Sequence, residues 1–294
     1  MLSMVLVPVL LMTAALQSPP VVSPVSAPTT ELRHDAGGRP VIGARLNGRG
    51  PFDMVLDTAA QTSLLTPALA QELALKPLEQ TMTIAGAVGG VEASVYPVDH
   101  YATDLFTADY VGMLALPNAS TTSARGIVGM ERFTDAKLVI DKTSARVSVE
   151  PSAPAPAGYA TIKGQTQNGL LSVPLVVNGV AIQALVDSGA GVTVANPKVL
   201  EALGWALDDP RLQAAGTVRG AAMTESQARI GKVDTLKLGP ISFGQVPMIF
   251  TDTGDDAEPR IILGSNLLNL LEAYAIDFPR AELQIRLPPR PAGH

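Results

Sequence analysis

The sequence predicts an all-β protein built from two homologous lobes that are related by a pseudo-twofold axis, with a short helix in each lobe. Short apolar or alternating runs are separated by Gly, Pro and Asn, as is typical of all-β domains. The second half of the chain also repeats the landmarks of the first half in the same order. We therefore divide the chain into a signal peptide or membrane anchor with a flexible leader (1–30), an N-terminal lobe (31–150), a linker (151–158), a C-terminal lobe (159–288) and a tail (289–294).

Most of the predicted elements in the first half are strands. One helix is expected over 67–75, because Pro67 suits a first helical turn and apolar residues follow at helical spacing. The stretch 151–158 is rich in Pro and Ala, as expected of a linker. The predicted strands are 41–46, 54–56, 82–84, 111–116, 138–140 and 147–149.

Four landmarks occur twice at nearly equal spacing. An Asn-Gly pair that suits a hairpin turn lies ten residues before Asp57 and nine residues before Asp187. A helix that begins with Pro follows each acid, at 67–75 and at 197–203. Gly129 and Gly264 end apolar segments 72 and 77 residues beyond the acids, and the segments LVID and YAID follow. A duplicated β domain explains this order, and a twofold axis brings equivalent loops face to face.

The two acids occupy equivalent positions, each after an apolar strand and within a tight turn. Such a carboxylate at the rim of a core is costly unless it is hydrogen-bonded or used. Two carboxylates about 3 Å apart cannot both ionise, so they share one proton and titrate in two steps. A water between them can lose a proton to the ionised acid while the other acid donates to a peptide carbonyl oxygen. The turns are Asp57-Thr58-Ala59-Ala60 and Asp187-Ser188-Gly189-Ala190.

Composition excludes several other classes of protein. The absence of cysteine excludes disulfides, thiol nucleophiles and Cys-ligated zinc. The three histidines, His34, His100 and His294, are not at metal-ligand spacing, so we expect no metal and no cofactor. The net charge of −6, without any cluster of Lys or Arg, argues against nucleic acid. The partner that we expect, a polypeptide substrate, is implied only by the family resemblance described below.

The first thirty residues predict export. Residues 2–16 form an uncharged apolar stretch that is short for a membrane span, and a Pro/Ser/Thr/Val-rich run continues to about Thr30. We interpret them as a signal peptide and a flexible leader of a periplasmic or secreted protein, with ordered sequence from near Leu32. Because no Lys or Arg precedes the apolar run, N-terminal membrane association through an uncleaved anchor stays open.

The paired loops resemble those of the pepsin and retropepsin-like aspartic endopeptidases, in which each lobe contributes an apolar-Asp-Thr/Ser-Gly loop and a later apolar-apolar-Gly strand. The resemblance extends from about residue 40 to residue 288 and implies two β-barrel lobes and an aspartic endopeptidase with catalytic Asp57 and Asp187. It implies that Thr58 and Ser188 hydrogen-bond across the two loops. It also implies that the glycines of the later strands, Gly129 and Gly264, admit close approach of the loop, and that Ala59 and Gly189 are equivalent loop positions.

A third match to the family tripeptide, Asp252-Thr253-Gly254, is followed by further acidic residues and a proline. In the repeat it falls opposite residues 117–123, so we interpret it as a solvated acidic turn.

Two Gly-rich hairpins after the acids are predicted to be substrate-binding flaps. The first spans 81–92 through Gly86, Gly89 and Gly90, and the second spans 217–225 through Gly220. Two flaps resemble the retroviral type fused into one chain, whereas ordinary surface hairpins are the alternative. Ala60 and Ala190 stand where pepsin-like lobes often carry a hydroxyl that stabilises the ionised acid, so we expect a mildly acidic pH optimum.

Ala59 departs from the family pattern, which has glycine at this position. If the position requires a backbone conformation open mainly to glycine, the methyl group costs about 1 kcal/mol and displaces Asp57. The alternative function is therefore a catalytically impaired peptide-binding module with the same fold. A third reading, a secreted β-sandwich for adhesion, explains the strands but not the matched acids.

Overall fold

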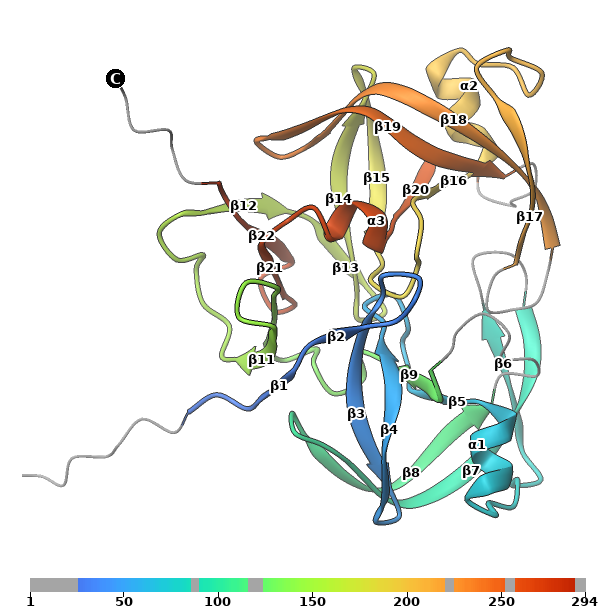
Figure 1. The fold of residues 1–294 in the computed structure, drawn as a ribbon, viewed down its shortest axis with the longest axis vertical. Coiled ribbons are helices and arrows are strands. Elements are labelled where there is room, and N and C mark those ends of the chain that lie inside the picture. Colours follow the sequence, from blue (N-terminus) through green and yellow to red (C-terminus); the bar gives the residue numbers. More distant parts are fainter. Residues whose placement is uncertain (1–25, 86–89, 116–123, 220–224, 252–256, 289–294) are drawn as a thin grey trace, which may run out of the picture.

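Strands far outnumber helices in this chain, and they form two barrels and one sheet that both lobes share (Figure 1). The computed structural model describes residues 26–85, 90–115, 124–219, 225–251 and 257–288. The N-terminal lobe fills the lower half of Figure 1 and the C-terminal lobe the upper half. The predicted fold class, an all-β protein of two related barrel lobes with short helices, is confirmed.

Six strands of the N-terminal lobe close into a barrel because β3 pairs with β4 on one side and with β7 on the other. Two further strands, β2 (Arg33–His34) and β6 (Thr81–Ala85), extend the sheet beyond the barrel. Around the barrel the order is β3 (Pro40–Leu46), β4 (Arg49–Leu56), β9 (Gly126–Val128), β5 (Leu64–Leu65), β8 (Thr107–Ala115) and β7 (Gly90–Thr103).

The C-terminal lobe repeats this arrangement, and the pairing of β14 with β18 closes its barrel. Here β13 (Gln165–Gln167) and β17 (Gln213–Arg219) are the outer strands. The barrel order is β14 (Leu170–Val177), β15 (Val180–Val186), β20 (Arg260–Leu263), β16 (Val194–Ala195), β19 (Ile241–Thr251) and β18 (Glu225–Leu238).

The two Asn-Gly pairs form the hairpin turns that their sequence predicts. Asn47 and Gly48 have φ of +50° and +75° between β3 and β4, and Asn178 and Gly179 have φ of +47° and +87° between β14 and β15. Positive φ at both central residues is the mark of the type I′ turn, whose twist matches that of the paired strands. These turns fix the register of each strand that ends at an acid.

A short helix lies in each lobe where Pro begins the predicted segment. Helix α1 (Pro67–Glu72) starts after Thr66, whose hydroxyl accepts a hydrogen bond from the N–H of Leu69 at 3.1 Å. It ends three residues before the predicted end at residue 75, because Ala74 has a φ of +53°. Helix α2 (Pro197–Leu203) matches its predicted bounds and ends at Gly204, which has a φ of +69°. A third helix, α3 (Ser265–Leu268), was not predicted.

A six-stranded antiparallel sheet joins the lobes, and it was not predicted from the sequence (Figure 1). Its central pairing aligns β10 with β21, with Val139 opposite Ala275, so the pseudo-twofold axis passes between these residues. The first strand of the sheet pairs Thr30 with Val147, which places the start of regular structure before the predicted boundary near Leu32. The strands are, in order, β1 (Thr29–Glu31), β11 (Arg146–Glu150), β10 (Lys137–Asp141), β21 (Ala273–Asp277), β22 (Glu282–Arg286) and β12 (Tyr159–Lys163).

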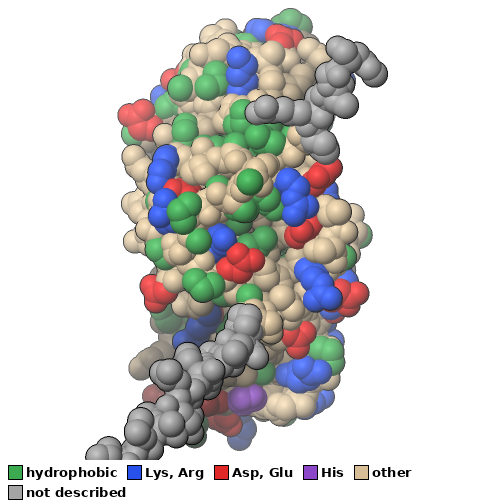
Figure 2. Space-filling model, turned by 90° about the vertical axis from the view of Figure 1, so that its left-hand side faces the viewer, with side chains coloured by type: hydrophobic (Ala, Val, Ile, Leu, Met, Phe, Trp, Pro, Cys, Tyr) green, Lys and Arg blue, Asp and Glu red, His purple; other side chains and the backbone are tan. Residues whose placement is uncertain are grey.

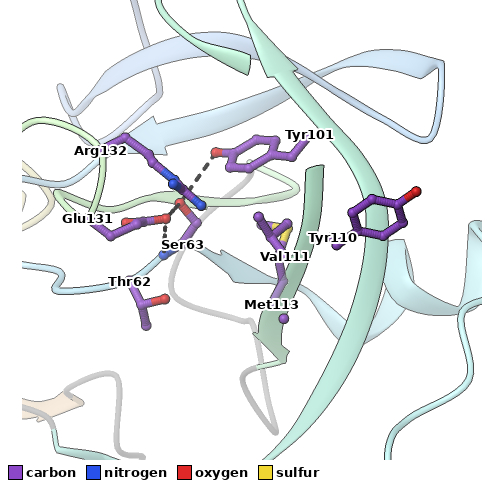
Figure 3. A pocket seen from close by; sticks show the side chains of 9 residues that line it. Thr62, Ser63, Tyr101, Tyr110, Val111, Met113, Glu131 and Arg132 are labelled. Atoms are coloured by element: carbon purple, nitrogen blue, oxygen red, sulfur yellow. Dashed lines mark hydrogen bonds between the residues drawn. The ribbon is translucent and has the colours of Figure 1, made fainter. Parts of the chain in front are cut away.

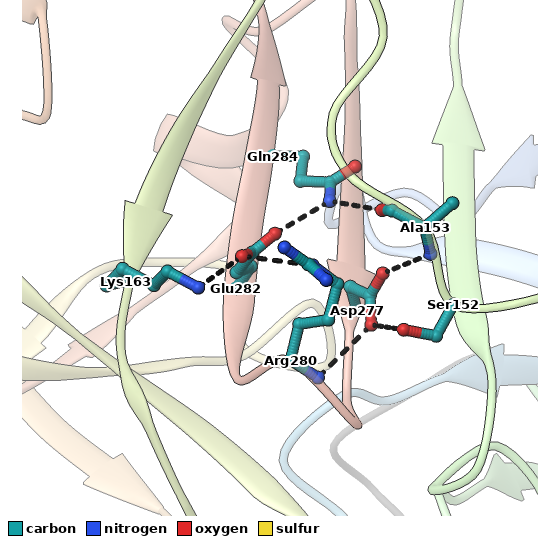
Figure 4. A network of polar contacts seen from close by, with 7 residues as sticks. All are labelled: Ser152, Ala153, Lys163, Asp277, Arg280, Glu282 and Gln284. Carbon is teal, nitrogen blue, oxygen red and sulfur yellow. Dashed lines mark hydrogen bonds and ion pairs between the residues drawn. The ribbon is translucent and has the colours of Figure 1, made fainter.

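The linker is fixed to this shared sheet by buried polar groups (Figure 4). Asp277 accepts hydrogen bonds from the hydroxyl of Ser152 at 2.7 Å and from the N–H of Ala153 at 3.0 Å. The amide of Gln284 donates to the carbonyl oxygen of Ala153 at 3.0 Å. Both side chains from the sheet are fully buried, so these bonds satisfy groups that water cannot reach.

Glu282 lies beside this contact and is also buried. It forms ion pairs with Lys163 at 2.5 Å and with Arg280 at 3.1 Å, and it accepts a hydrogen bond from Gln284 at 2.9 Å. Burial raises the pKa of Glu282, but the hydrogen bonds from Lys163, Gln284 and Arg280 outweigh it and lower the pKa to about 2. Glu282 on β22 therefore stays ionised and links β22 to β12 through its ion pair with Lys163.

One apolar core runs through both lobes and the shared sheet, and it includes Leu56 and Val128 below one acid loop and Val186 and Leu263 below the other. Figure 2 shows the face that carries the shared sheet, on which the described basic and acidic side chains are interspersed. Within the described part of the chain, no helix is both long enough and apolar enough to cross a membrane.

Candidate active site

The two acids lie at equivalent strand ends. Asp57 follows β4 and Asp187 follows β15, and each of these strands pairs in parallel with the apolar segment of the same lobe. The N–H of Asp57 donates to the carbonyl oxygen of Val128 at 3.0 Å, and the N–H of Asp187 donates to that of Leu263 at 3.0 Å. The repeated landmarks thus place both acids in the same local geometry, on loops that face each other across the axis.

The carboxyl groups of Asp57 and Asp187 meet and share a hydrogen bond. Burial is the largest influence on both and raises both pKa values. The negative charge of Asp57 further raises the pKa of Asp187, which lies well above its usual range. At Asp57, backbone N–H groups, the carboxyl of Asp187 and the positive charge of Arg39 oppose the effect of burial. The arrangement therefore favours a pair that holds one proton.

Thr58 and Ser188 connect the two loops through buried hydrogen bonds. The N–H of Thr58 donates to the Ser188 hydroxyl at 3.1 Å, and the N–H of Ser188 donates to the Thr58 hydroxyl at 3.0 Å. Each hydroxyl also donates into the opposite strand, from Thr58 to the carbonyl oxygen of Val186 at 2.8 Å and from Ser188 to that of Leu56 at 2.5 Å. These bonds fix the loops, and hence the acids, relative to each other.

Gly129 and Gly264 lie where the acid loop passes over the neighbouring strand. A methyl group on Gly129 would lie 2.5 Å from the carbonyl carbon of Thr62, and one on Gly264 would lie 2.6 Å from that of Val192. Real Cβ atoms do not approach other atoms so closely, so only glycine allows the loop to pack here.

Ala59 and Gly189 show that the glycine of the family loop is not required by backbone conformation. Neither residue has a positive φ, so the condition under which the methyl group of Ala59 would strain the backbone is not met. The restriction at Gly189 is steric, because a methyl group there would overlap the carboxyl group of Asp57, with Oδ1 at 2.8 Å. The N–H of Ala59 donates to Oδ1 of Asp57 at 2.8 Å, which holds that acid in place.

The candidate flaps form hairpins on the opposite side of the molecule from the shared sheet (Figure 1). In the first, β6 pairs with β7 up to Ala85 and Gly90. In the second, β17 pairs with β18 up to Arg219 and Glu225. The tips that contain Gly86, Gly89 and Gly220 lie outside the described residues, as does the tripeptide Asp252-Thr253-Gly254.

A second pair of side chains behind the acid loop was missed by the sequence analysis (Figure 3). Glu131 accepts hydrogen bonds from the N–H of Ser63 at 3.1 Å and from its hydroxyl at 2.6 Å, and that hydroxyl accepts one from the N–H of Gly129 at 3.1 Å. Ser63 and Glu131 line a pocket of about 290 Å³, together with Tyr101 and Tyr110. We call these hydrogen bonds of Ser63 with Glu131 and Gly129 the latch. The latch joins the Asp57 loop to the segment that contains Gly129.

The C-terminal lobe has the same latch in a neutral form. The hydroxyl of Thr193 donates to Asn266 at 2.8 Å and accepts from the N–H of Gly264 at 3.2 Å. Ser63 and Thr193 both lie six residues after an acid, so a hydroxyl at matching positions of the repeat was the available signal.

Arg39 was also missed. It lies in the turn between β2 and β3 and pairs with Asp35 at 2.6 Å. Burial raises the pKa of Asp35, but the hydrogen bonds and charge of Arg39 outweigh it and lower the pKa. The same turn reaches the other lobe, because the amide of Asn269 donates to the carbonyl oxygen of Gly38 at 2.6 Å. A cation near Asp57 is therefore held by contacts with both lobes.

Comparison with known proteins agrees with this geometry. A family model described as Aspartyl protease matches the chain twice, over residues 42–132 and residues 173–267. The chain belongs to the aspartyl protease family. Each match lies within one lobe of the chain and contains one acid and its later glycine, Asp57 with Gly129 and Asp187 with Gly264. The prediction of a two-lobed chain related to aspartic proteases is confirmed.

Among solved structures, the crystal structure of a retropepsin-like aspartic protease from Rickettsia conorii is similar to this chain. The two are 23% identical, and the alignment covers 44% of this chain and 91% of the other, with a TM-score of 0.36. No curated protein matches this chain. The described residues contain no group of three or more His, Asp or Glu side chains placed to bind a metal ion.

Proposed function

We propose that this chain is an aspartic endopeptidase that hydrolyses peptide bonds with a water activated between Asp57 and Asp187. The observation that carries the proposal is the hydrogen-bonded contact between two carboxyl groups supplied by different lobes. Charge repulsion between neighbouring carboxylates and burial both favour a pair that holds one proton. Such a pair contains a base and an acid in one site.

In the proposed reaction, ionised Asp57 takes a proton from the water while the oxygen of that water attacks the peptide carbonyl carbon. Protonated Asp187 donates its proton to the carbonyl oxygen, which gives a neutral tetrahedral diol. Proton transfer from Asp57 to the amide nitrogen, and from the diol back to Asp187, breaks the C–N bond and releases a carboxylic acid and an amine. The pair returns to its starting state with one proton.

An extended polypeptide is the substrate that we propose, with the hairpins β6–β7 and β17–β18 as its cover. Extended peptides pair with strand edges through backbone hydrogen bonds, which suits a site between two β lobes. We propose that Gly86, Gly89, Gly90 and Gly220 are substrate-binding residues of these two flaps.

The second candidate function is a peptide-binding module that has lost catalysis, and Ala59 is the observation that favours it. The structure weakens the physical reason for it, since Ala59 adopts an ordinary backbone conformation and its N–H hydrogen-bonds to Asp57. We therefore rank the endopeptidase first.

Cleavage of a denatured protein of mixed sequence by the full chain, followed from pH 3 to 7, tests the proposal. Asp57→Asn and Asp187→Asn are each expected to lose at least about 10³-fold in rate, because the two acids act as a unit. Asp135→Asn, at an exposed acid, is the matched control and should keep the parent rate. Pepstatin serves as an additional probe of the site.

Two results would overturn the endopeptidase. A folded parent that cuts nothing but binds peptides would favour the impaired module. Cleavage that survives both Asn variants would place the chemistry elsewhere.

We also propose that the chain is exported, on the basis of the apolar stretch at residues 2–16, with attachment to a membrane through this stretch as the alternative. Cell fractionation with N-terminal sequencing of the mature protein distinguishes the two. A cytosolic protein with an intact N-terminus would contradict both.

A further inference from the structure

The two acid turns are equivalent in the fold, and at their third residue one carries a methyl group, Ala59, where the other has none, Gly189. Gly189 lies against the carboxyl group of Asp57, where a methyl group would overlap the carboxyl carbon and one oxygen and lie 2.8 Å from the other oxygen. Ala59 is the equivalent position in the other loop, so we infer from the pseudo-twofold relation that its methyl group faces the carboxyl group of Asp187. That position already carries a methyl group.

If Asp187 approached Ala59 as closely as Asp57 approaches Gly189, its carboxyl group would overlap the methyl group. The loop hydrogen bonds do not distinguish the two acids, because Asp57 accepts from the N–H groups of Ala59 and Ala60 and Asp187 accepts from those of Gly189 and Ala190. The bonds from Ala59 and Ala190 both measure 2.8 Å.

The methyl group also changes the surroundings of only one acid. A methyl group offers no hydrogen bond and occupies space that water would fill, so it disfavours the charged form of its neighbour. The other groups that act on the pair point the same way. Arg39 favours ionisation of Asp57, whereas Asp57 and the hydroxyl of Tyr274 are the titratable groups that act on Asp187, and neither supplies a positive charge.

We propose that Ala59 is a positioning residue that assigns the shared proton of the pair to Asp187. This inference rests on the proposed function, because it gives each acid of that reaction a fixed role. The burial and charge effects that raise the pKa of Asp187 more than that of Asp57 are consistent with it.

The test exchanges the methyl group between the loops of the full chain. Carboxyl titration is followed by NMR on protein labelled with ¹³C at Asp, with Asp57→Asn and Asp187→Asn to assign the two signals. In Ala59→Gly, Asp187 is expected to titrate about one pH unit lower than in the parent. In the double variant Ala59→Gly/Gly189→Ala, the carboxyl that keeps its proton to higher pH is expected to change from Asp187 to Asp57.

Ala60→Gly is the control for loop flexibility, since it also replaces an alanine by glycine in this loop. Its titration order should be that of the parent. If Ala59→Gly leaves both titrations unchanged, or shifts them no more than Ala60→Gly does, the inference is wrong. If the double variant does not fold, the single variant Ala59→Gly still decides.

The titration does not depend on turnover, so it separates the two proposals. Where the parent cleaves peptides, Ala59→Gly should also lower the upper pH limit of kcat/KM by the same amount and leave the lower limit in place. A parent that cleaves nothing but shows the expected titrations would refute the endopeptidase and keep the role of Ala59.

Discussion

Thr58 and Ser188, which are 130 residues apart in the chain, exchange hydrogen bonds between each backbone N–H and the other residue's hydroxyl, at 3.1 and 3.0 Å. Both residues are fully buried. Because each hydroxyl also donates to a carbonyl oxygen of the opposite lobe, four polar contacts cross the axis directly beneath the acids. The relative position of Asp57 and Asp187 depends on these contacts.

Thr58→Val should therefore destabilise the protein. The change keeps the shape of the side chain but removes one donor and one acceptor, which leaves the N–H of Ser188 and the carbonyl oxygen of Val186 buried without their partner. We expect a loss of about 1–3 kcal/mol in the free energy of unfolding, measured by urea denaturation. Thr58→Ser should retain most of the stability, and Thr161→Val, at an exposed threonine, should change it by less than about 0.5 kcal/mol. Equal effects of Thr58→Val and Thr161→Val would contradict this role.

Gly129→Ala is expected to displace the Asp57 loop, because the new methyl group would lie 2.5 Å from the carbonyl carbon of Thr62. Overpacking against backbone costs about 1–3 kcal/mol, and thermal unfolding measures it. Gly244→Ala is the matched control, since its nearest contact would be at 3.9 Å and its φ is not positive. If both variants have the same melting temperature as the parent, Gly129 does not limit the packing of the loop.

The ion pairs of Glu282 should make the shared sheet sensitive to acid. The pKa of this carboxyl is lowered to about 2, so its contribution to stability is present above the ordinary pKa of glutamate and is lost as pH falls through the folded value. We expect Glu282→Gln to remove part of the stability that the parent has at pH 6 and to lie closer to the parent near pH 2. Urea denaturation at both pH values tests this, with Glu201→Gln on the exposed face of α2 as control. A constant difference at all pH values would refute the ionic role.

The pair of Asp57 and Asp187 should have the opposite pH dependence. Burial and the charge of Asp57 raise the pKa of Asp187 above the unfolded value, so its favourable contribution is complete below the unfolded pKa and is lost as pH rises through the folded pKa. Asp187→Asn removes this penalty, so the variant should gain stability relative to the parent at pH 7 and not at pH 3. Thermal unfolding at the two pH values measures the difference. The same raised pKa predicts that proteolysis has a mildly acidic optimum, and full activity at pH 2 with none at pH 5 would contradict it.

Much of the fold could be predicted because a duplicated domain repeats the same motifs in the same order along the sequence. Strand periodicity, the turns at Asn47 and Asn178 and the proline before each helix are local features that the structure reproduces. Only the start of strand β7 was predicted, in the hairpin over 81–92, because Pro97 and Asp99 interrupt the apolar pattern of this 14-residue strand. Its pairing with β3, β6 and β8 outweighs the local sequence.

The sequence by itself identified the positions of the two acids and their later glycines and showed that the two sets are equivalent. The reason is that both sets belong to short motifs that occur twice in the same order. Only the tertiary structure decided how the equivalent parts meet. The shared sheet, the network around Asp277 and the latch of Ser63 with Glu131 join residues that are far apart in the chain, and no local pattern encodes those contacts. The asymmetry between Ala59 and Gly189 is visible as one letter in the sequence, but its meaning depends on a carboxyl group of the opposite lobe.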